Sequence, residues 1–246
     1  MSSAAEMDGG QADAARGLIV ALDFPSAEEA ARLAAQLRGQ ISIFKIGLEL
    51  VYADGLGLAR NLAEAGHQIF LDAKLLDIPN TVERATANAA RLGAAFLTVH
   101  GADRKTLDAA VRGRGGAATK LLAITVLTSL DAADLKEQHI GLGPAELVLR
   151  RARLARDAGF DGVVASAQEA ASIRAELGDS FLIVTPGIRP AGAEAADQSR
   201  IVTPAEAIAR GADYLVVGRP ISAAPDPLGA ARAIIAEMAA ARTGRR

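Results

Sequence analysis

Residue types that build many small sites are missing from this chain. It contains no cysteine and no tryptophan, and aromatic residues make up only 3% of it. The lack of cysteine excludes disulfides and thiolate metal sites, so the cytoplasm is the expected compartment. The scarcity of aromatic side chains argues against platforms that stack on bases or sugars.

Long runs of basic residues and long runs of apolar residues are missing as well. The net charge is −2 and no long basic run occurs, so we expect no nucleic-acid partner. No apolar run approaches the roughly 20 residues that a membrane span requires, so we expect no membrane partner. Residues 1–16 lack the apolar segment of a signal peptide and carry two early acids, which favours a frayed tail.

The rest of the chain, residues 17–246, alternates between short apolar runs and alanine-rich amphipathic stretches. The apolar runs predict strands at 18–23, 42–47, 68–74, 96–100, 120–127, 162–166, 181–187 and 213–218. The amphipathic stretches predict helices at 26–37, about 52–65, 80–92, about 103–112, 144–158 and 167–177, and from about 204 and 227 onward. Ser26, with Glu29 three residues later, is the expected N-cap of the first helix.

This strict alternation predicts a single domain of the α/β class. Continuous Val, Ile and Leu runs separated by helices indicate a parallel sheet that is covered on its outer face. Eight βα units in about 230 residues close into a (β/α)8 TIM barrel. A doubly wound open sheet is the alternative, but the GxGxxG turn after the first strand is missing.

Charged residues fall where the predicted strands end, which is where barrels of this kind carry their chemistry. The first strand ends in Asp23, the second carries Lys45, and the third carries Asp72 and Lys74. Residues two apart share a strand face, about 6–7 Å from each other, so we expect these charges around one barrel mouth. Any single one is more simply explained by an ion-pair network that orders the rim. A cluster of desolvated charges costs several kcal/mol per ion unless tightly paired, and this favours a functional site.

Two further strand ends carry polar groups. Strand 96–100 ends in His100, and strand 120–127 runs into Thr128 and Ser129. One His at a strand end is more often a hydrogen-bonded rim residue than a base. A metal site needs several well-placed ligands, and each carboxylate here lies close to a competing lysine, so we expect no metal.

The last two strands carry the features of a phosphate site. The loop 185–204 is far longer than its neighbours, and the eighth strand ends in VVGRP, 216–220. Loops after strands seven and eight of such barrels commonly hold a phosphate through backbone N–H groups. An ordinary turn with a solvated arginine is the alternative, but a loop of this length is usually a lid or a binding loop. The residues suited to hold the anion are Gly187, Arg189, Gln198, Gly218 and Arg219.

The stretch LDAKLLDIPNT, 71–81, resembles the D-x-K-x-x-D-I-P-N-T signature of the orotidine 5′-phosphate decarboxylase family. The resemblance extends through VALD, FKIG, TVLTS, DGVVASAQEA, VTPGIRP and VVGRP, and so covers residues 17–240. The D-x-K-x-x-D core is shared with sugar-phosphate decarboxylases and synthases. Its continuation as DIPNT, together with TPGIRP and GRP, is highly specific.

The resemblance implies an activity and the groups at its reacting centre. It implies decarboxylation of orotidine 5′-monophosphate to uridine 5′-monophosphate, the last step of UMP biosynthesis, without a cofactor. Lys74 would give a proton to C6 of the pyrimidine as CO₂ leaves. Asp72 and Asp77 would flank Lys74, and Lys45 would hold the array.

The resemblance also implies how the remainder of the substrate is bound. Asp23 and Lys45 would contact the ribose, and Thr128 the pyrimidine. Arg189, Gln198, Gly218 and Arg219 would hold the phosphate and close the lid. The segment after the third strand, Asp77, Ile78, Pro79, Asn80 and Thr81, would also bind substrate. Its Asp77, Ile78 and Thr81 would reach the partner subunit's site, which implies a homodimer.

Two alternative functions stay open at this point. A keto-gulonate-phosphate decarboxylase or hexulose-phosphate synthase would share the barrel and the D-x-K-x-x-D core but would use Mg²⁺. The IPNT that follows Asp77 argues against these enzymes. A non-catalytic nucleotide-binding barrel would be expected to lack a member of the charged array, and all four positions are filled.

Overall fold

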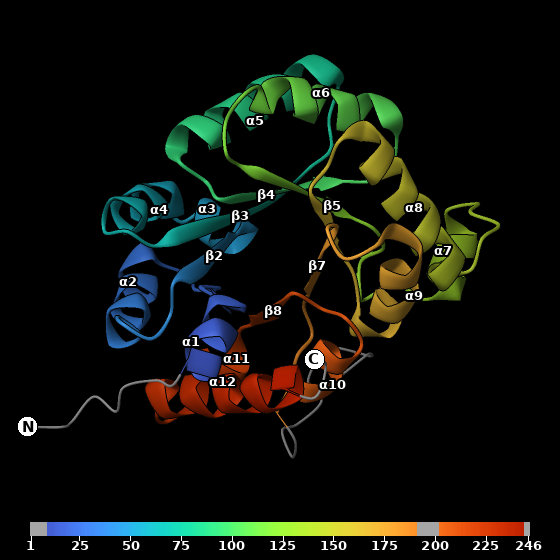
Figure 1. The fold of residues 1–246 in the computed structure, drawn as a ribbon. Coiled ribbons are helices and arrows are strands. Elements are labelled where there is room, and N and C mark those ends of the chain that lie inside the picture. Colours follow the sequence, from blue (N-terminus) through green and yellow to red (C-terminus); the bar gives the residue numbers. More distant parts are fainter. Residues whose placement is uncertain (1–8, 191–201, 244–246) are drawn as a thin grey trace, which may run out of the picture.

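The computed structural model describes residues 9–190 and 202–243. Eight parallel strands close into one barrel in sequence order, with β8 paired to β1 (Figure 1). This confirms the predicted (β/α)8 barrel. The strands are β1 Leu18–Ala21, β2 Ile43–Gly47, β3 Gln68–Leu75, β4 Phe96–His100, β5 Lys120–Ile124, β6 Gly162–Val164, β7 Leu182–Thr185 and β8 Tyr214–Val217.

Helices surround the strands on the outside of the barrel (Figure 1). They are α1 Gly9–Arg16, α2 Ala27–Gln36, α3 Leu48–Val51, α4 Gly55–Glu64, α5 Pro79–Leu92, α6 Arg104–Arg114, α7 Ala132–Glu137, α8 Pro144–Ala158, α9 Ala167–Leu177, α10 Pro204–Ala209, α11 Arg219–Ser222 and α12 Pro227–Thr243. The Ser26 side chain accepts a hydrogen bond from the Glu29 amide, so the predicted cap of α2 is confirmed. None of the described helices is long and apolar enough to cross a membrane.

Two predicted elements differ from the structure by three residues at one end, and the others by fewer. The helix expected over about 52–65 is α4, Gly55–Glu64, which begins only after Asp54, a residue in a left-handed backbone with φ of 60°; a separate short helix, α3, precedes it at Leu48–Val51. Gly55 follows at a close approach, where a Cβ would lie 2.4 Å from the carbonyl oxygen of Leu50. The strand expected to run to residue 127 ends at Ile124. The three residues that follow β5 are therefore available to line a site.

The expectation of a frayed tail through residue 16 is wrong for its second half. Gly9–Arg16 form α1, which lies beside α12 (Figure 1). Ala14 and Ala15 are buried, and Arg242 of α12 donates 2.9 Å hydrogen bonds to the main-chain and side-chain oxygens of Asp13. A run of small alanines is thus held by packing against a distant helix. Residues 1–8 lie outside the described part of the chain.

The barrel interior is apolar except at the carboxyl ends of the strands, where it carries charged side chains. Side chains from seven of the strands fill it, namely Ile19, Ala21, Ile43, Phe70, Phe96, Leu122, Val184 and Val216. Successive side chains of a strand alternate between its two faces, so the interior face of β2 continues from Ile43 to Lys45 and that of β3 from Phe70 to Asp72. The chain thereby changes from hydrophobic to ionisable groups at the carboxyl ends of the strands.

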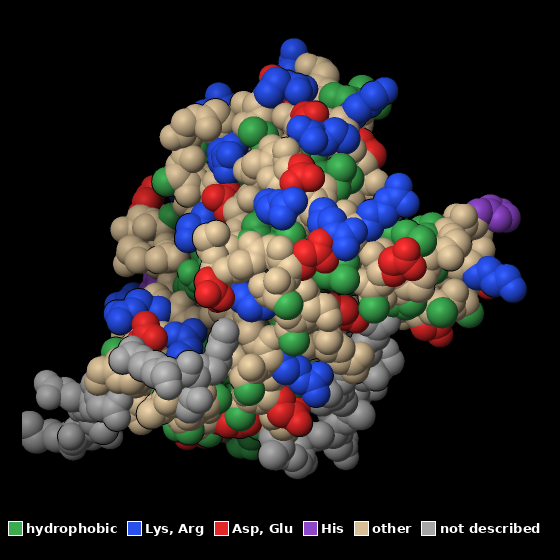
Figure 2. All heavy atoms as spheres, turned by 45° about the vertical axis from the view of Figure 1, so that its right-hand side comes forward, with side chains coloured by type: hydrophobic (Ala, Val, Ile, Leu, Met, Phe, Trp, Pro, Cys, Tyr) green, Lys and Arg blue, Asp and Glu red, His purple; other side chains and the backbone are tan. Residues whose placement is uncertain are grey.

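Charges of both signs are interspersed on the helical face that Figure 2 turns forward. Ion pairs join neighbouring outer helices, α8 to α9 through Arg153 and Glu176, and α6 to α5 through Arg112 and Glu83 at 2.9 Å. Exposed pairs of this kind contribute little to stability, typically about 0.2–1 kcal/mol each. They give the outer helices a mixed, water-compatible surface.

Candidate active site

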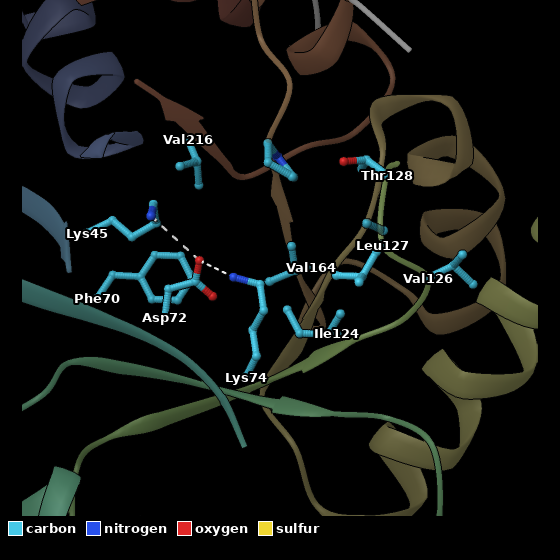
Figure 3. A pocket seen from close by; sticks show the side chains of 12 residues that line it. Lys45, Phe70, Asp72, Lys74, Ile124, Val126, Leu127, Thr128, Val164 and Val216 are labelled. Carbon is cyan, nitrogen blue, oxygen red and sulfur yellow. Dashed lines mark hydrogen bonds and ion pairs between the residues drawn. The ribbon is translucent and has the colours of Figure 1, made fainter. Parts of the chain in front are cut away.

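Four charged side chains of alternating sign form a chain across the barrel mouth. Lys45 Nζ lies 2.8 Å from Asp23 Oδ1 and 3.6 Å from Asp72 Oδ2, and Lys74 Nζ lies 2.6 Å from that same Asp72 oxygen. Figure 3 shows both ammonium groups directed at the Asp72 carboxylate. The structure therefore brings together the four residues that the strand ends predicted.

The Asp72 carboxyl is ionised in this arrangement. Burial alone would raise its pKa, but the charges of Lys45 and Lys74 and the hydrogen bonds from Lys74 and Thr98 outweigh burial and hold the pKa below its ordinary value. Opposite charges within a few ångströms favour the charged form of an acid. Asp72 is thus a fixed negative charge inside the barrel mouth.

A bulge in β3 sets the direction of Lys74. Leu71 pairs with Leu97 of β4, but the next pair is Leu75 with Val99, so three β3 residues face a single β4 residue, Thr98. Lys74 adopts a φ of 47°, in the left-handed region. Regular alternation predicted that Asp72 and Lys74 share a face. They do meet, but through a bulged backbone, of the kind that often re-aims a side chain beside an active site.

A cavity of about 190 Å³ opens beside this array. Lys45, Asp72 and Lys74 provide its charged wall, and Thr128 provides a hydroxyl. Figure 3 shows these polar groups facing apolar side chains that come from β3, β5, β6 and β8 and from the segment after β5. The apolar wall consists of Phe70, Ile124, Val126, Leu127, Val164, Ala165, Pro186 and Val216.

A second cavity, of about 380 Å³, adjoins the first, and both are lined by Lys45, Pro186 and Val216. Its other lining residues include Asp23, Glu49, Gly187, Arg189, Gly218, Arg219 and Ser222. Burial, and next the positive charge of Arg219, lowers the pKa of Arg189. Two guanidinium groups that line the same cavity and repel each other favour the binding of an anion in it.

Glycine at position 47 makes room for the first ion pair. A Cβ on Gly47 would lie 2.7 Å from Lys45 Nζ and 3.0 Å from Asp23 Oδ1. Contacts this short essentially never occur, so a side chain here would displace the Lys45–Asp23 pair. The glycine that ends β2 is thus explained by the neighbouring ion pair, which could not be recognised from the sequence.

The segment after β3 does not line either cavity of its own chain. Asp77, Ile78, Pro79, Asn80 and Thr81 are all exposed, and they lead into the first turn of α5. Asp77 Oδ1 accepts a 2.6 Å hydrogen bond from the Ile78 amide. These predicted site residues therefore point to water in a single subunit.

The other predicted residues fall into two groups. Thr128 and the phosphate candidates Gly187, Arg189, Gly218 and Arg219 line the cavities, whereas Gln198 lies outside the described residues.

His100 is half-buried at the end of β4 and lines neither cavity. Burial, followed by the charges of Arg151 and Lys74, lowers its pKa, so it is neutral at pH 7. Within residues 9–190 and 202–243, no three His, Asp or Glu side chains gather as metal ligands.

Sequence reasoning missed Thr98 and the apolar wall. Thr98 is completely buried and is bonded to both Asp72 and Lys74. Its signal was a hydroxyl in the middle of an otherwise apolar strand. The wall residues Ile124, Val126 and Val164 gave no signal, because pocket and core valines look alike in a sequence.

These features define a (β/α)8-barrel enzyme with its site at the carboxyl ends of the strands. A family model for the orotidine 5′-phosphate decarboxylase / HUMPS family matches residues 16–234. The chain belongs to this family.

Individual relatives cover almost the whole chain. An orotidine 5′-phosphate decarboxylase of Afipia carboxidovorans is 55% identical over 224 residues, which are 91% of this chain and 95% of that protein. One of a Methylobacterium species is 56% identical over 227 residues, 91% of this chain and 96% of that protein. The crystal structure of orotidine 5′-phosphate decarboxylase from Lactobacillus acidophilus matches with a TM-score of 0.81 and 39% identity. It covers 91% of this chain and 99% of its own.

Proposed function

We propose that this enzyme decarboxylates orotidine 5′-monophosphate to uridine 5′-monophosphate in pyrimidine biosynthesis, with Lys74 as the proton donor and without a cofactor. The observation that carries the proposal is the Lys74 ammonium group, held 2.6 Å from Asp72 in the lining of a largely apolar cavity. The names of the relatives support the same reaction.

The two cavities suit the two ends of such a nucleotide. The smaller one, of about 190 Å³, has apolar walls for a flat ring and the Thr128 hydroxyl for a ring polar group. The larger one contains Arg189 and Arg219 for a phosphate dianion. Lys45 lines both cavities and Asp23, paired with it, lines the larger one, so the two residues are placed for contact with ribose hydroxyls.

The chemistry needs one bond to break and one to form. The bond between C6 and the carboxylate carbon breaks, its electron pair stays on C6, and CO₂ departs. Lys74 Nζ then gives a proton to C6 and recovers one from water. A fixed ammonium group next to C6 stabilises the carbanion that develops there in the transition state. It stabilises the uncharged C6 of the ground state much less.

Asp72 has two roles in this proposal. It holds Lys74 in place through the short ion pair, with Lys74 Nζ 2.6 Å from Asp72 Oδ2. Its negative charge also lies near the position of the substrate carboxylate, which leaves as neutral CO₂. Repulsion between the two carboxylates is therefore relieved as the reaction proceeds.

The proposal includes a homodimer in which Asp77, Ile78 and Thr81 complete the partner's site. Support comes from exposed apolar groups on the β2 and β3 units of the barrel. Tyr52 is 88% exposed, Ile78 66% and Leu76 56%, and Leu48 and Leu56 are exposed as well. Large apolar side chains gathered on one side of a protein mark an interaction surface. In a dimer formed there, the Asp77 side chain, exposed to water in a single subunit, would extend into the partner's cavity.

The test is an absorbance assay of the purified enzyme with orotidine 5′-monophosphate, together with identification of the product. Loss of the orotate absorbance with release of one CO₂ and one uridine 5′-monophosphate per substrate is the expected result. A protein that binds the nucleotide but leaves it unchanged would contradict the proposed function.

A further inference from the structure

We infer that Thr98 is a positioning residue of this site, whose hydroxyl holds the β3 bulge and thereby fixes the direction of the Lys74 ammonium group. The inference deepens the proposed function and rests on it for its kinetic consequence. It has a second, structural consequence that can be measured without any substrate.

One hydroxyl serves both members of the reacting pair. Thr98 Oγ1 accepts a 2.9 Å hydrogen bond from the main-chain N–H of Lys74, and it donates a 2.9 Å hydrogen bond to Asp72 Oδ1. The residue is 0% exposed, so water cannot replace either bond without rearrangement. The donor and an acceptor site of this hydroxyl are thus both used on the Asp72–Lys74 pair.

The backbone of Lys74 needs such a support. Its φ of 47° is a backbone conformation that residues other than glycine rarely adopt. Such a conformation persists only where the surrounding structure imposes it. Because the ladder between β3 and β4 is interrupted from Leu71 to Leu75, the Lys74 N–H bonds to a side chain of β4 instead of a β4 carbonyl. Thr98 is the residue opposite the interruption.

Thr98→Val keeps the shape of the side chain and removes only the hydroxyl. We expect kcat to fall about 10- to 100-fold, because small displacements of a reacting group cost rates of this order. Substrate KM should change much less, since Thr98 lines neither cavity. Thr98→Ser, which restores the hydroxyl, should recover most of the activity.

The pH profile gives a readout that a purely structural role would not move. The hydrogen bond from Thr98 is one of the interactions that lower the pKa of Asp72. Lys45 from β2, Lys74 on β3 itself and His100 from β4 also face Asp72, with Asp23 behind Lys45, and none of them changes in the variant. The acid limb of kcat/KM should therefore move to higher pH in Thr98→Val.

Thr119→Val is the matched control. Thr119 is a buried threonine just before β5, and its hydroxyl donates a 2.8 Å hydrogen bond to the Ala94 carbonyl at the opposite end of the barrel. Both variants lose a buried hydroxyl, but only Thr98→Val should lower kcat. If Thr98→Val does not fold, the pair Thr98→Ser and Thr98→Ala, which differ only in the hydroxyl, carries the same comparison.

Hydrogen exchange of the Lys74 amide, followed by NMR without substrate, completes the test. We expect this amide to exchange at least about tenfold faster in Thr98→Val than in wild type or Thr119→Val, since its hydrogen bond is gone. Unchanged exchange together with wild-type kcat in Thr98→Val would overturn the inference. A wild-type enzyme with no decarboxylase activity would instead refute the proposed function, and the exchange rates would still decide the role of Thr98.

Discussion

Lys74 Nζ and Asp72 Oδ2 lie 2.6 Å apart although the backbone that joins the two residues is bulged and not regularly pleated. The pair is therefore held by specific bonds and not by strand geometry alone. A charge that is fixed before the substrate arrives needs no reorganisation during the reaction, and such preorganised charges usually make the largest single contribution to catalysis. The expected behaviour of the enzyme follows from this pair and from the groups around it.

Removal of divalent metals should leave the activity unchanged. The Asp72 carboxylate is already neutralised by two ammonium groups, at 2.6 Å and 3.6 Å, which occupy the positions that a cation would take. Turnover of orotidine 5′-monophosphate is measured before and after EDTA treatment, and again with added Mg²⁺. Activity that is lost with EDTA and restored by Mg²⁺ would favour the metal-dependent sugar-phosphate enzymes of the same superfamily.

Asp77 should act in the partner subunit's site. Lys74→Ala and Asp77→Ala are each expected to be nearly inactive as homodimers, but a mixed dimer would contain one intact site and one doubly damaged site. Random exchange of equal amounts should restore about a quarter of the wild-type activity, because half of the dimers are mixed and each has one good site. Subunit exchange is verified by mass spectrometry. No recovery despite complete exchange would assign Asp77 to its own chain's site.

Arg219 should act on the phosphate and not on the ring. Arg219→Ala should lower kcat/KM for the nucleotide. The expected loss of transition-state stabilisation is about 2–5 kcal/mol, the cost of removing one partner of a charge pair that is desolvated in the complex. The same variant should barely change the slow turnover of orotidine, which lacks the phosphate. Both substrates are measured on both proteins. Equal losses for the two substrates would mean that Arg219 supports the fold or the ring pocket.

Acid should weaken the fold partly through Asp72. Its folded-state pKa lies below the ordinary value of 3.8, so ionised Asp72 contributes stability above that pH. This contribution is lost as the pH falls through the lowered pKa of the folded protein. The free energy of unfolding in urea, compared between wild type and Asp72→Asn, should therefore converge below pH 3.8. A difference that stays constant from pH 7 to pH 3 would contradict this role of Asp72.

The barrel and most of the charged array could be predicted from the sequence because both follow from simple periods. Alternating strands and helices predict the closed sheet, and the two-residue period carries Ala21 to Asp23, Ile43 to Lys45 and Phe70 to Asp72. Each of these steps occurs within one strand or, for Asp23, two residues beyond the end of β1. Local rules are sufficient there.

What the sequence did not predict depends on contacts between distant segments. Helix α1 is held by the burial of Ala14 and Ala15 and by hydrogen bonds to Asp13 from Arg242, more than two hundred residues later. The position of Lys74 depends on the register of β3 against β4 and on Thr98, which no property of β3 alone reveals. The exposed Asp77 has a proposed role only in a second subunit. In each case the decisive partner is far away in the sequence or in another chain.

The turnover number of Lys74→Ala tests the central claim most directly. With orotidine 5′-monophosphate at saturation, kcat should fall by at least about 10²–10³-fold, the cost of removing one preorganised charge from a reacting centre. Lys105→Ala, which removes an exposed lysine of α6 that lines neither cavity, is the control and should retain full activity. Both variants should unfold as cooperatively as the wild type. A correctly folded Lys74→Ala enzyme with near wild-type kcat would contradict the assignment of Lys74 as the proton donor.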